Sequence, residues 1–269
     1  MNTPMDKPRK PLVLVTGGTG TLGRFVIPRL QAAGHPVRVL SRKALAGGDG
    51  IEYATSDLST GEGLEAAVVG ADVIVHCAGT RKGDGDKTRH LVRAASRAEV
   101  RHLVYISVVG ADTIPVVSAV DRAMFGYFAC KLDAERVISE SGIPWTTLRA
   151  TQFYDSFLLV VRGMAKLPVI PIPTGARFQP VDTGEVAARL VELALAPPAG
   201  LVADIGGPRA YPMGDLLKAY LRASHKHRAL VPMRVPGKAA RAVRAGANLT
   251  PEHAVGKRTW EEFLVERVR

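Results

Sequence analysis

Cysteine and long apolar runs are both scarce in this chain of 269 residues. Only Cys77 and Cys130 could form a disulfide, so no disulfide framework is expected and a reducing compartment is indicated. No apolar stretch approaches the length needed to cross a bilayer. The apolar run at residues 12–15 follows basic residues, but it is too short for a secretory leader. We therefore expect a cytoplasmic protein without a membrane partner.

Acidic residues are fewer than basic ones, 25 Asp and Glu against 36 Lys and Arg, and the formal net charge is +11. Residues 218–269 alone carry 12 Lys and Arg against 4 Asp and Glu. A basic segment of this kind can face nucleic acid, a membrane surface or an acidic partner. No nucleic-acid-binding motif or interleaved aromatic pattern accompanies the charge, so we interpret it as a solvated basic surface and expect no nucleic-acid partner.

Short apolar segments alternate with helical patterns through the first 150 residues. The pattern predicts strands at 12–15, 37–40, 51–55, 72–77, 102–107 and 145–149, and helices at 22–33, 87–99 and 127–141. Such alternation is typical of an α/β protein with a Rossmann-type doubly wound parallel sheet. We expect this core to cover residues 1–150.

The alternation loosens after Arg149. A loop-rich stretch at 168–180 precedes a helix at 183–196 and a strand at 201–205 that returns to the main sheet. Two further helices are expected within residues 207–269. The sequence thus predicts a smaller C-terminal substrate lobe over residues 151–269, interleaved with the last sheet strand in one compact unit.

A glycine-rich turn joins the first strand to the first helix. Gly17, Gly20 and Gly23 are three residues apart, and Thr19 and Thr21 offer hydroxyl donors. Glycines let the backbone approach phosphates closely, and the helix N-terminus supplies free N–H groups and a positive dipole end. An ordinary tight turn is the alternative, but a turn that opens a βαβ series favours dinucleotide binding. The predicted phosphate-binding residues are Gly17, Gly18, Thr19, Gly20, Thr21, Leu22 and Gly23.

The end of the second strand indicates which dinucleotide binds. NAD-binding proteins place an acidic residue there for the ribose 2′-hydroxyl, whereas this chain has Ser41, Arg42 and Lys43. A guanidinium can hold a 2′-phosphate through two parallel hydrogen bonds. We therefore predict NADP(H) in preference to NAD(H), with a solvated basic strand end as the alternative.

Together these motifs resemble the short-chain dehydrogenase/reductase superfamily, in particular its atypical branch of NmrA-like and NAD(P)H-binding proteins. The resemblance rests on the glycine spacing and on "SDL" at 56–58, "CAGT" at 77–80, "YISVVGAD" at 105–112, "SGIPWTTLRATQF" at 141–153, "FQPVDTGEVA" at 178–187 and the closing "TWEEFL". It implies that Asp57 and Leu58 contact the adenine, and that Cys77, Ala78, Gly79 and Thr80 run along the adenosine.

The resemblance also implies that Tyr127 and Lys131 form the family's Tyr-x-x-x-Lys pair, with Ser107 beside the nicotinamide. The alternative is a packing tyrosine and a surface lysine. On a helical wheel, however, Lys131 falls at the edge of an apolar stripe and away from the charged face. A free phenol has a pKa of about 10, and a nearby ammonium is expected to lower it. Tyr127 would then protonate a carbonyl oxygen that Ser107 steadies, while Lys131 holds the ribose of the cofactor.

Gln152 and Phe153 follow the sixth strand, where open α/β sheets bind ligands, and are predicted on the substrate side. His225 and His227 lack an acidic or cysteine companion, so no metal site is expected. The sequence predicts an NADPH-dependent oxidoreductase that reduces a carbonyl, enone or quinone of a small, largely apolar molecule. The alternatives are a non-catalytic NADP(H)-sensing regulator that contacts a protein partner, and an epimerase or isomerase that retains its cofactor. The sequence is also compatible with a homodimer.

Overall fold

The computed structural model of the chain describes residues 9–79 and 83–268. A parallel sheet of seven strands in the order β3-β2-β1-β4-β5-β6-β9 forms its centre. The strands are β1 (Val13–Thr16), β2 (Val37–Ser41), β3 (Ile51–Thr55), β4 (Val73–His76), β5 (His102–Val108), β6 (Trp145–Ala150) and β9 (Gly200–Leu201). This sheet confirms the predicted α/β, Rossmann-type doubly wound architecture.

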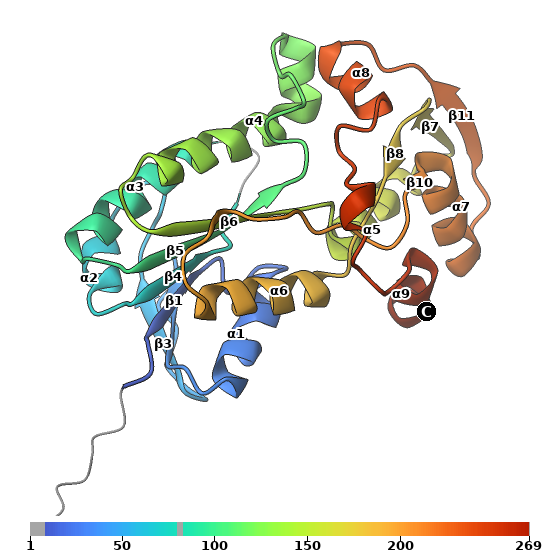
Figure 1. Cartoon of the computed structure of the whole chain (residues 1–269). Coiled ribbons are helices and arrows are strands. Elements are labelled where there is room, and N and C mark those ends of the chain that lie inside the picture. Colours follow the sequence, from blue (N-terminus) through green and yellow to red (C-terminus); the bar gives the residue numbers. More distant parts are fainter. Residues whose placement is uncertain (1–8, 80–82, 269) are drawn as a thin grey trace, which may run out of the picture.

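Helices cover both faces of the sheet because both faces are apolar. Val13 and Val15 point to the layer of α1 (Gly23–Ala32) and α6 (Thr183–Leu195), whereas Leu14 between them joins the opposite core. That second layer contains α2 (Leu64–Val68), α3 (Asp84–Arg97) and α4 (Ala119–Ser139), as Figure 1 shows. Burial on both faces explains why the strand sequences read as continuous apolar runs instead of alternating ones.

Helix α4 begins eight residues before its predicted start at 127 because a capping box forms upstream. Asp121 N–H donates to Ser118 Oγ, and the Asp121 carboxylate accepts from Ser118 N–H. Asp121 also accepts a hydrogen bond at 3.2 Å from the N–H of Ala239, in α8 (Lys238–Arg244). One carboxylate thus fixes the N-terminal turns of two helices.

The remaining elements lie beside the sheet, where most of them share one apolar cluster, whereas α8 packs in a smaller cluster with Ile114 and Ala176. These elements are α5 (Tyr154–Met164), β7 (Val169–Pro173), β8 (Arg177–Phe178), β10 (Tyr211–Pro212), α7 (Met213–Ala223), β11 (Ala229–Met233), α8, a short 3₁₀ turn (Pro251–His253) and α9 (Trp260–Arg267). Trp260 and Tyr154 are fully buried at the centre of the larger cluster. The predicted boundary at residue 150 stays a prediction.

Three expectations for the C-terminal part are wrong in detail. Residues 207–269 form three α-helices instead of two, because α8 is held by the distant cap at Asp121. The last sheet strand is only Gly200–Leu201, and Ile205 forms an isolated bridge to Ala150. The stretch at 168–180 contains β7 and β8 instead of loops alone. Within the described residues, no helix has the length and apolar character required to cross a membrane.

Candidate functional site

A cleft of about 1260 Å³ lies at the carboxyl ends of the central strands. It brings together most of the residues predicted from sequence, namely Gly17, Thr19, Gly20, Thr21, Leu22, Ser41, Arg42, Lys43, Asp57, Leu58, Cys77, Ala78, Gly79, Ser107, Tyr127, Lys131, Gln152 and Phe153. Gly18 and Gly23 pack behind the turn instead of lining the cleft. Thr80 lies outside the described residues. The cleft opens where the strand order reverses between β1 and β4, the usual ligand site of such sheets.

The glycine turn has no room for side chains. Gly17 has φ +67°, and a Cβ there would lie 2.7 Å from the backbone nitrogen of Ala78. A Cβ on Gly23 would collide with the carbonyl oxygen of Gly17, so the turn closes tightly on itself. Within the described chain no side chain caps α1 at Leu22, and the N–H groups of Arg24 and Phe25 donate to the carbonyl oxygens of Gly20 and Leu22. These features fit a pyrophosphate at the helix N-terminus.

A buried hydrogen-bond chain supports the turn from behind, and sequence reasoning missed it. The N–H of Ala78 donates to Thr16 Oγ1 at 3.2 Å, and Thr16 Oγ1 lies 2.6 Å from His76 Nδ1. His76 Nε2 lies 3.2 Å from Thr88 Oγ1 in α3. Burial and the nearby Lys131 lower the pKa of His76 to about 3, so the imidazole is neutral. It can therefore accept from Thr16 and donate to Thr88.

Two exposed cations, Arg42 and Lys43, stand at the far end of the cleft after β2. Asp57 lies opposite, and its Oδ1 accepts the N–H of Ser59 at 2.7 Å. That backbone hydrogen bond lowers the pKa of Asp57, and Arg42 and Lys87 lower it further. Lys87 of α3 also lines the cleft and was not predicted. This end of the cleft therefore combines a fixed carboxylate with three cationic side chains.

Lys131 is buried in the wall of the cleft and is 3% exposed. Its Nζ donates to the carbonyl oxygen of Ile106 at 3.1 Å and lies 3.7 Å from Asp84 Oδ2. It also lies 5.7 Å from the centroid of the Tyr127 ring and 4.7 Å from that of Tyr105. A surface lysine is thus excluded, whereas the role of the Tyr127–Lys131 pair stays a prediction. Asp84 was missed because it lies on α3, far from Lys131 in the sequence.

The electrostatics of Tyr127 differ from the sequence expectation. Burial on the cleft side and the negative charge of Asp84 raise the pKa of Tyr127 above its ordinary value, although 39% of the side chain remains exposed. The expectation that the pKa of Tyr127 lies below its ordinary value is therefore wrong. Burial lowers the pKa of Lys131 itself, while Asp84 opposes that shift. Tyr127 is consequently a protonated phenol at neutral pH.

Ser107 lies on the same wall, but its hydroxyl is buried. The side chain is 4% exposed, and its Oγ has no hydrogen-bond partner among the described residues. Thr151 Oγ1 and Gln152 Oε1 are buried in the same unpartnered way in the described chain, at the end of β6. Burial also raises the pKa of Cys77 to about 12, which keeps this cleft-lining thiol protonated.

Arg149 ties the helix that carries Tyr127 to the sheet. Its guanidinium donates two hydrogen bonds to Glu135 of α4, at 2.9 and 2.7 Å, and one to Asp112 at 2.8 Å. These hydrogen bonds raise the pKa of Arg149, so its guanidinium is charged throughout the physiological pH range.

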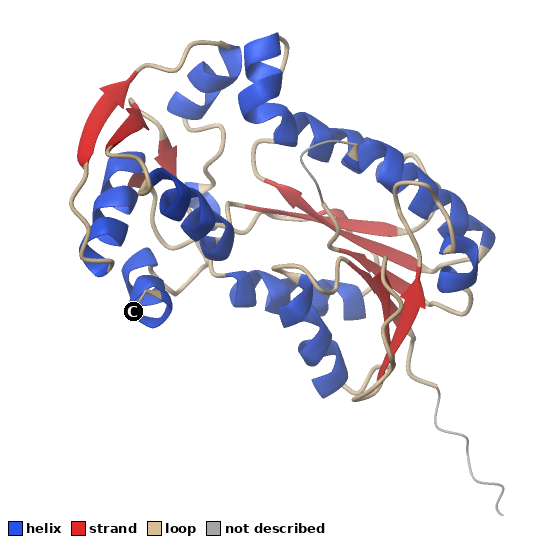
Figure 2. Cartoon of the chain, turned by 180° about the vertical axis from the view of Figure 1, so that it is seen from behind, coloured by secondary structure: helices blue, strands red, loops and turns tan. Residues whose placement is uncertain are grey.

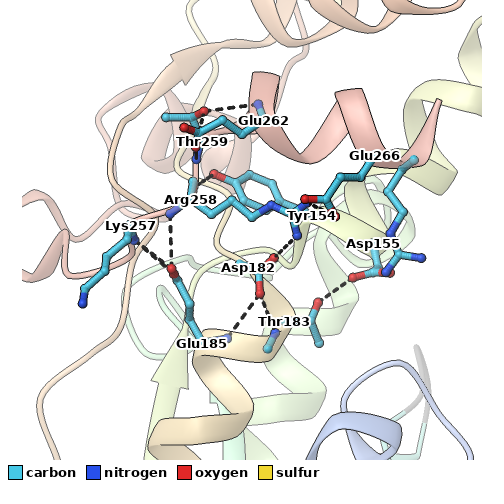
Figure 3. A network of polar contacts seen from close by, with 12 residues as sticks. Tyr154, Asp155, Asp182, Thr183, Glu185, Lys257, Arg258, Thr259, Glu262 and Glu266 are labelled. Carbon is cyan, nitrogen blue, oxygen red and sulfur yellow. Dashed lines mark hydrogen bonds and ion pairs between the residues drawn. The ribbon is translucent and has the colours of Figure 1, made fainter. Parts of the chain in front are cut away.

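A second polar network joins α5 and α6 to the C-terminal segment (Figure 3). Arg258 donates to Asp182 at 3.0 Å, and its carbonyl oxygen accepts from the Tyr154 hydroxyl at 2.6 Å. Asp155 accepts from Thr183 at 2.8 Å, as Figure 3 shows. Asp155 also forms an ion pair with Arg24 of α1 at 2.7 Å. The helix that begins at the glycine turn is therefore linked directly to the helix that follows Gln152 and Phe153. Among the described residues, His, Cys, Asp and Glu form no group that could hold a metal ion.

The strand order, the glycine turn and the cleft at the switch point define a dinucleotide-binding Rossmann protein. The chain belongs to the NAD(P)H-binding family, whose model matches residues 17–158.

Curated relatives include reductases. The chain is 30% identical over 181 residues to the (4-alkanoyl-5-oxo-2,5-dihydrofuran-3-yl)methyl phosphate reductase of Streptomyces griseus, covering 66% of this chain and 61% of the relative. It is 24% identical over 226 residues to quinone oxidoreductase 2 of Escherichia coli, covering 80% of this chain and 75% of the relative. The matches span 53% and 57% of two other relatives, so the chain covers only part of several of these proteins.

Solved structures share the fold over nearly the whole chain. The NADPH complex of the E. coli quinone oxidoreductase superposes with a TM-score of 0.78 at 19% identity, covering 96% of this chain and 100% of the other. The NADP(H) complex of triphenylmethane reductase from Citrobacter sp. gives 0.72 at 19% identity, covering 96% and 99%. At these identities the likeness establishes the fold alone.

Proposed function

We propose that this protein is an NADPH-dependent oxidoreductase that reduces a carbonyl, enone or quinone group of a small, largely apolar molecule. The observation that carries the proposal is that Tyr127 and the buried Lys131 line the same cleft as the glycine turn. A cofactor turn and a proton donor in one cleft are what a reductase of this kind requires.

The preference for NADPH rests on charge. Arg42 and Lys43 follow β2 at the place where NAD-binding proteins carry an acidic residue, and Lys87 adds a third cation to that end of the cleft. An adenosine 2′-phosphate would gain attraction from all three, whereas a 2′-hydroxyl would gain little. The glycine turn would hold the pyrophosphate, Asp57 and Leu58 the adenine side, and Lys131 the ribose next to the nicotinamide.

The proposed substrate class follows from the other end of the cleft. Its wall contains the apolar side chains of Ile106, Val108, Ala150 and Phe153, beside Gln152. Relatives named as quinone and azo reductases support this class without defining the substrate.

In the proposed mechanism, NADPH held in this cleft would supply the hydride that the substrate carbon accepts. Tyr127 donates its hydroxyl proton to the substrate oxygen, and the raised pKa keeps this donor protonated at neutral pH. The Lys131 ammonium, 5.7 Å from the ring centroid, stabilises the phenolate that remains. The exposed part of Tyr127 allows solvent to return the proton.

The proposal is tested by NADPH oxidation with a panel of ketones, enones and quinones. Tyr127→Phe is expected to lower kcat by about 10²- to 10⁴-fold with the Kd for NADPH unchanged, since general acid catalysis contributes a factor of this size. Turnover of an identified substrate by Tyr127→Phe at the wild-type rate would refute the mechanism. NADPH binding without oxidation across the panel would favour the sensing protein, and cofactor that copurifies and is never consumed would favour the epimerase.

A further inference from the structure

The two-stranded parallel ribbon of β7 and β11 is apolar on both faces. Its register pairs Val169 with Ala229, Pro171 with Val231, and Pro173 with Met233. Ile170 and Leu230 pack inward on the cluster around α7. Because side chains alternate along a strand, the three listed pairs form the opposite, outer face. That face consists of Val169, Pro171, Pro173, Ala229, Val231 and Met233 and contains no polar side chain; we call it the outer ribbon face.

The outer ribbon face is open to solvent. Val169, Val231 and Met233 are 49%, 48% and 47% exposed, and Leu167 just before β7 is 46% exposed. The ribbon stands at the edge of the molecule, away from the central sheet (Figures 1 and 2). A solvent-facing ribbon normally alternates apolar and polar residues, so a wholly apolar outer face indicates an interaction surface.

Cationic residues precede and follow β11 along the chain and have no acidic partners among the described residues. Residues 222–238 contain no Asp or Glu, and their basic residues are Arg222, Lys226, Arg228, Arg234 and Lys238. None of the ion pairs between described residues involves these five side chains or Lys166. A shallow hollow of about 600 Å³, lined by Lys166, Pro168, His227, Arg228 and Ala229, lies at the end of the ribbon where β7 and β11 begin.

The ribbon is poorly suited to pair with another strand or another copy of itself. Pro171, Pro173 and Pro232 lack the N–H groups that strand addition needs. In a symmetric pair of ribbons, each copy would also bring its own uncompensated cations against those of the other. The occupant that fits must be both apolar and anionic.

We propose that the outer ribbon face docks the protein on the surface of an anionic phospholipid bilayer. The apolar side chains enter the boundary between headgroups and acyl chains, and the Lys and Arg that flank β11 in the chain contact lipid phosphates. The hollow at Lys166 and Arg228 accommodates one headgroup phosphate. The proposal does not depend on the proposed reductase activity. It departs from the sequence-based expectation of no membrane partner, because the outer face becomes apparent only once the strand register is known.

Co-sedimentation with vesicles tests the proposal on the full chain without cofactor or substrate. Binding to phosphatidylglycerol-containing vesicles is expected, with little binding to pure phosphatidylcholine and a decrease as salt rises. The double variant Val231→Glu/Met233→Glu is expected to weaken binding by about tenfold or more, since two apolar side chains no longer leave water. Val265→Glu is the matched control, because Val265 is 78% exposed on α9 and lies outside the ribbon.

Absence of vesicle binding would overturn the proposal, as would equal binding to neutral and anionic vesicles. It would also be overturned if the ribbon variant bound as well as the Val265→Glu control. Concentration-dependent dimerisation that is lost only in the ribbon variant would assign the outer ribbon face to self-association instead. Circular dichroism of each variant separates loss of binding from loss of folding.

Discussion

Lys131 Nζ and Asp84 Oδ2 lie 3.7 Å apart, and both side chains are only 3% exposed. This pair connects α4 to the first turn of α3 beneath the cleft. A buried ion pair adds little net stability, but removing one partner leaves an uncompensated charge in a poorly solvated place. Tyr127 lies on α4, and through this ion pair its position also depends on α3.

Replacement of Asp84 by Asn is expected to destabilise the fold. The free energy of unfolding should fall by about 3–5 kcal/mol, and Lys131→Met in the same chain should restore part of the loss. Urea denaturation of the wild type, the two single variants and the double variant measures this coupling. Asp86→Asn is the control, because Asp86 lies in the same helical turn with its side chain 71% exposed and should cost less than about 1 kcal/mol. Equal losses at Asp84 and Asp86 would contradict the argument.

Arg42→Ala is expected to alter cofactor selectivity. Loss of a charged hydrogen bond worth about 1.5–3 kcal/mol should raise the Kd for NADPH by roughly 10- to 100-fold. The Kd for NADH should change little, which makes it an internal control in the same fluorescence titration. An equal loss of affinity for both cofactors would show that Arg42 acts on the fold of the cleft instead of on the 2′-phosphate.

Gly17→Ala is expected to abolish cofactor binding. The added Cβ would sit 2.7 Å from the nitrogen of Ala78 at a residue with φ +67°, so the turn must distort. Gly163→Ala in α5 is the matched control, since among the described atoms nothing lies within 4 Å of its added Cβ. The control should bind cofactor normally and gain about 0.5–1 kcal/mol of stability as a helical alanine. Calorimetric titration and thermal unfolding measure the two effects.

His76 is expected to make the protein sensitive to acid. Its pKa is lowered to about 3 in the folded chain, so between pH 6.5 and 3 the unfolded chain binds more protons. Stability from this group is complete above pH 6.5 and is lost progressively as the pH falls toward 3. His76→Gln should reduce that dependence, and His227→Gln, at an exposed position, should not. The urea midpoint of each variant is measured at pH 7 and at pH 4.5. If the midpoint of His76→Gln fell between these pH values as much as that of the wild type, the assignment would be refuted.

Much of the fold could be predicted because the relevant signals are local. The central strands read as apolar runs. Gly34, Gly70 and Gly142 each follow a helix and have positive φ, the conformation that commonly ends a helix. The glycine turn was recognisable for the same reason, since the spacing of its glycines is itself a local signal of a tight turn between a strand and a helix. The early start of α4 was missed because its capping box uses Asp121 in place of the more usual Glu or Gln.

The features that could not be predicted depend on contacts between distant segments. The wheel correctly indicated that Lys131 avoids the charged face. It could not reveal the burial of Tyr127 on the cleft side or the presence of Asp84 on a neighbouring helix, which together raise the pKa of Tyr127. The burial of the Ser107 hydroxyl on β5 is likewise a property of the folded chain that its own segment does not reveal. The chain through Thr16, His76 and Thr88 was likewise invisible, since each residue is unremarkable within its own segment.

Asp121 has a consequence for how this sequence can diverge. The same carboxylate closes the capping box of α4 and receives the Ala239 N–H, and a Cβ on Gly237 would lie 2.5 Å from its Oδ1. Two segments more than a hundred positions apart in the sequence are therefore constrained by one side chain. In related chains, replacement of the residue at 121 should occur together with changes at 118 and around 237–239, and an alignment of close relatives would reveal this covariation.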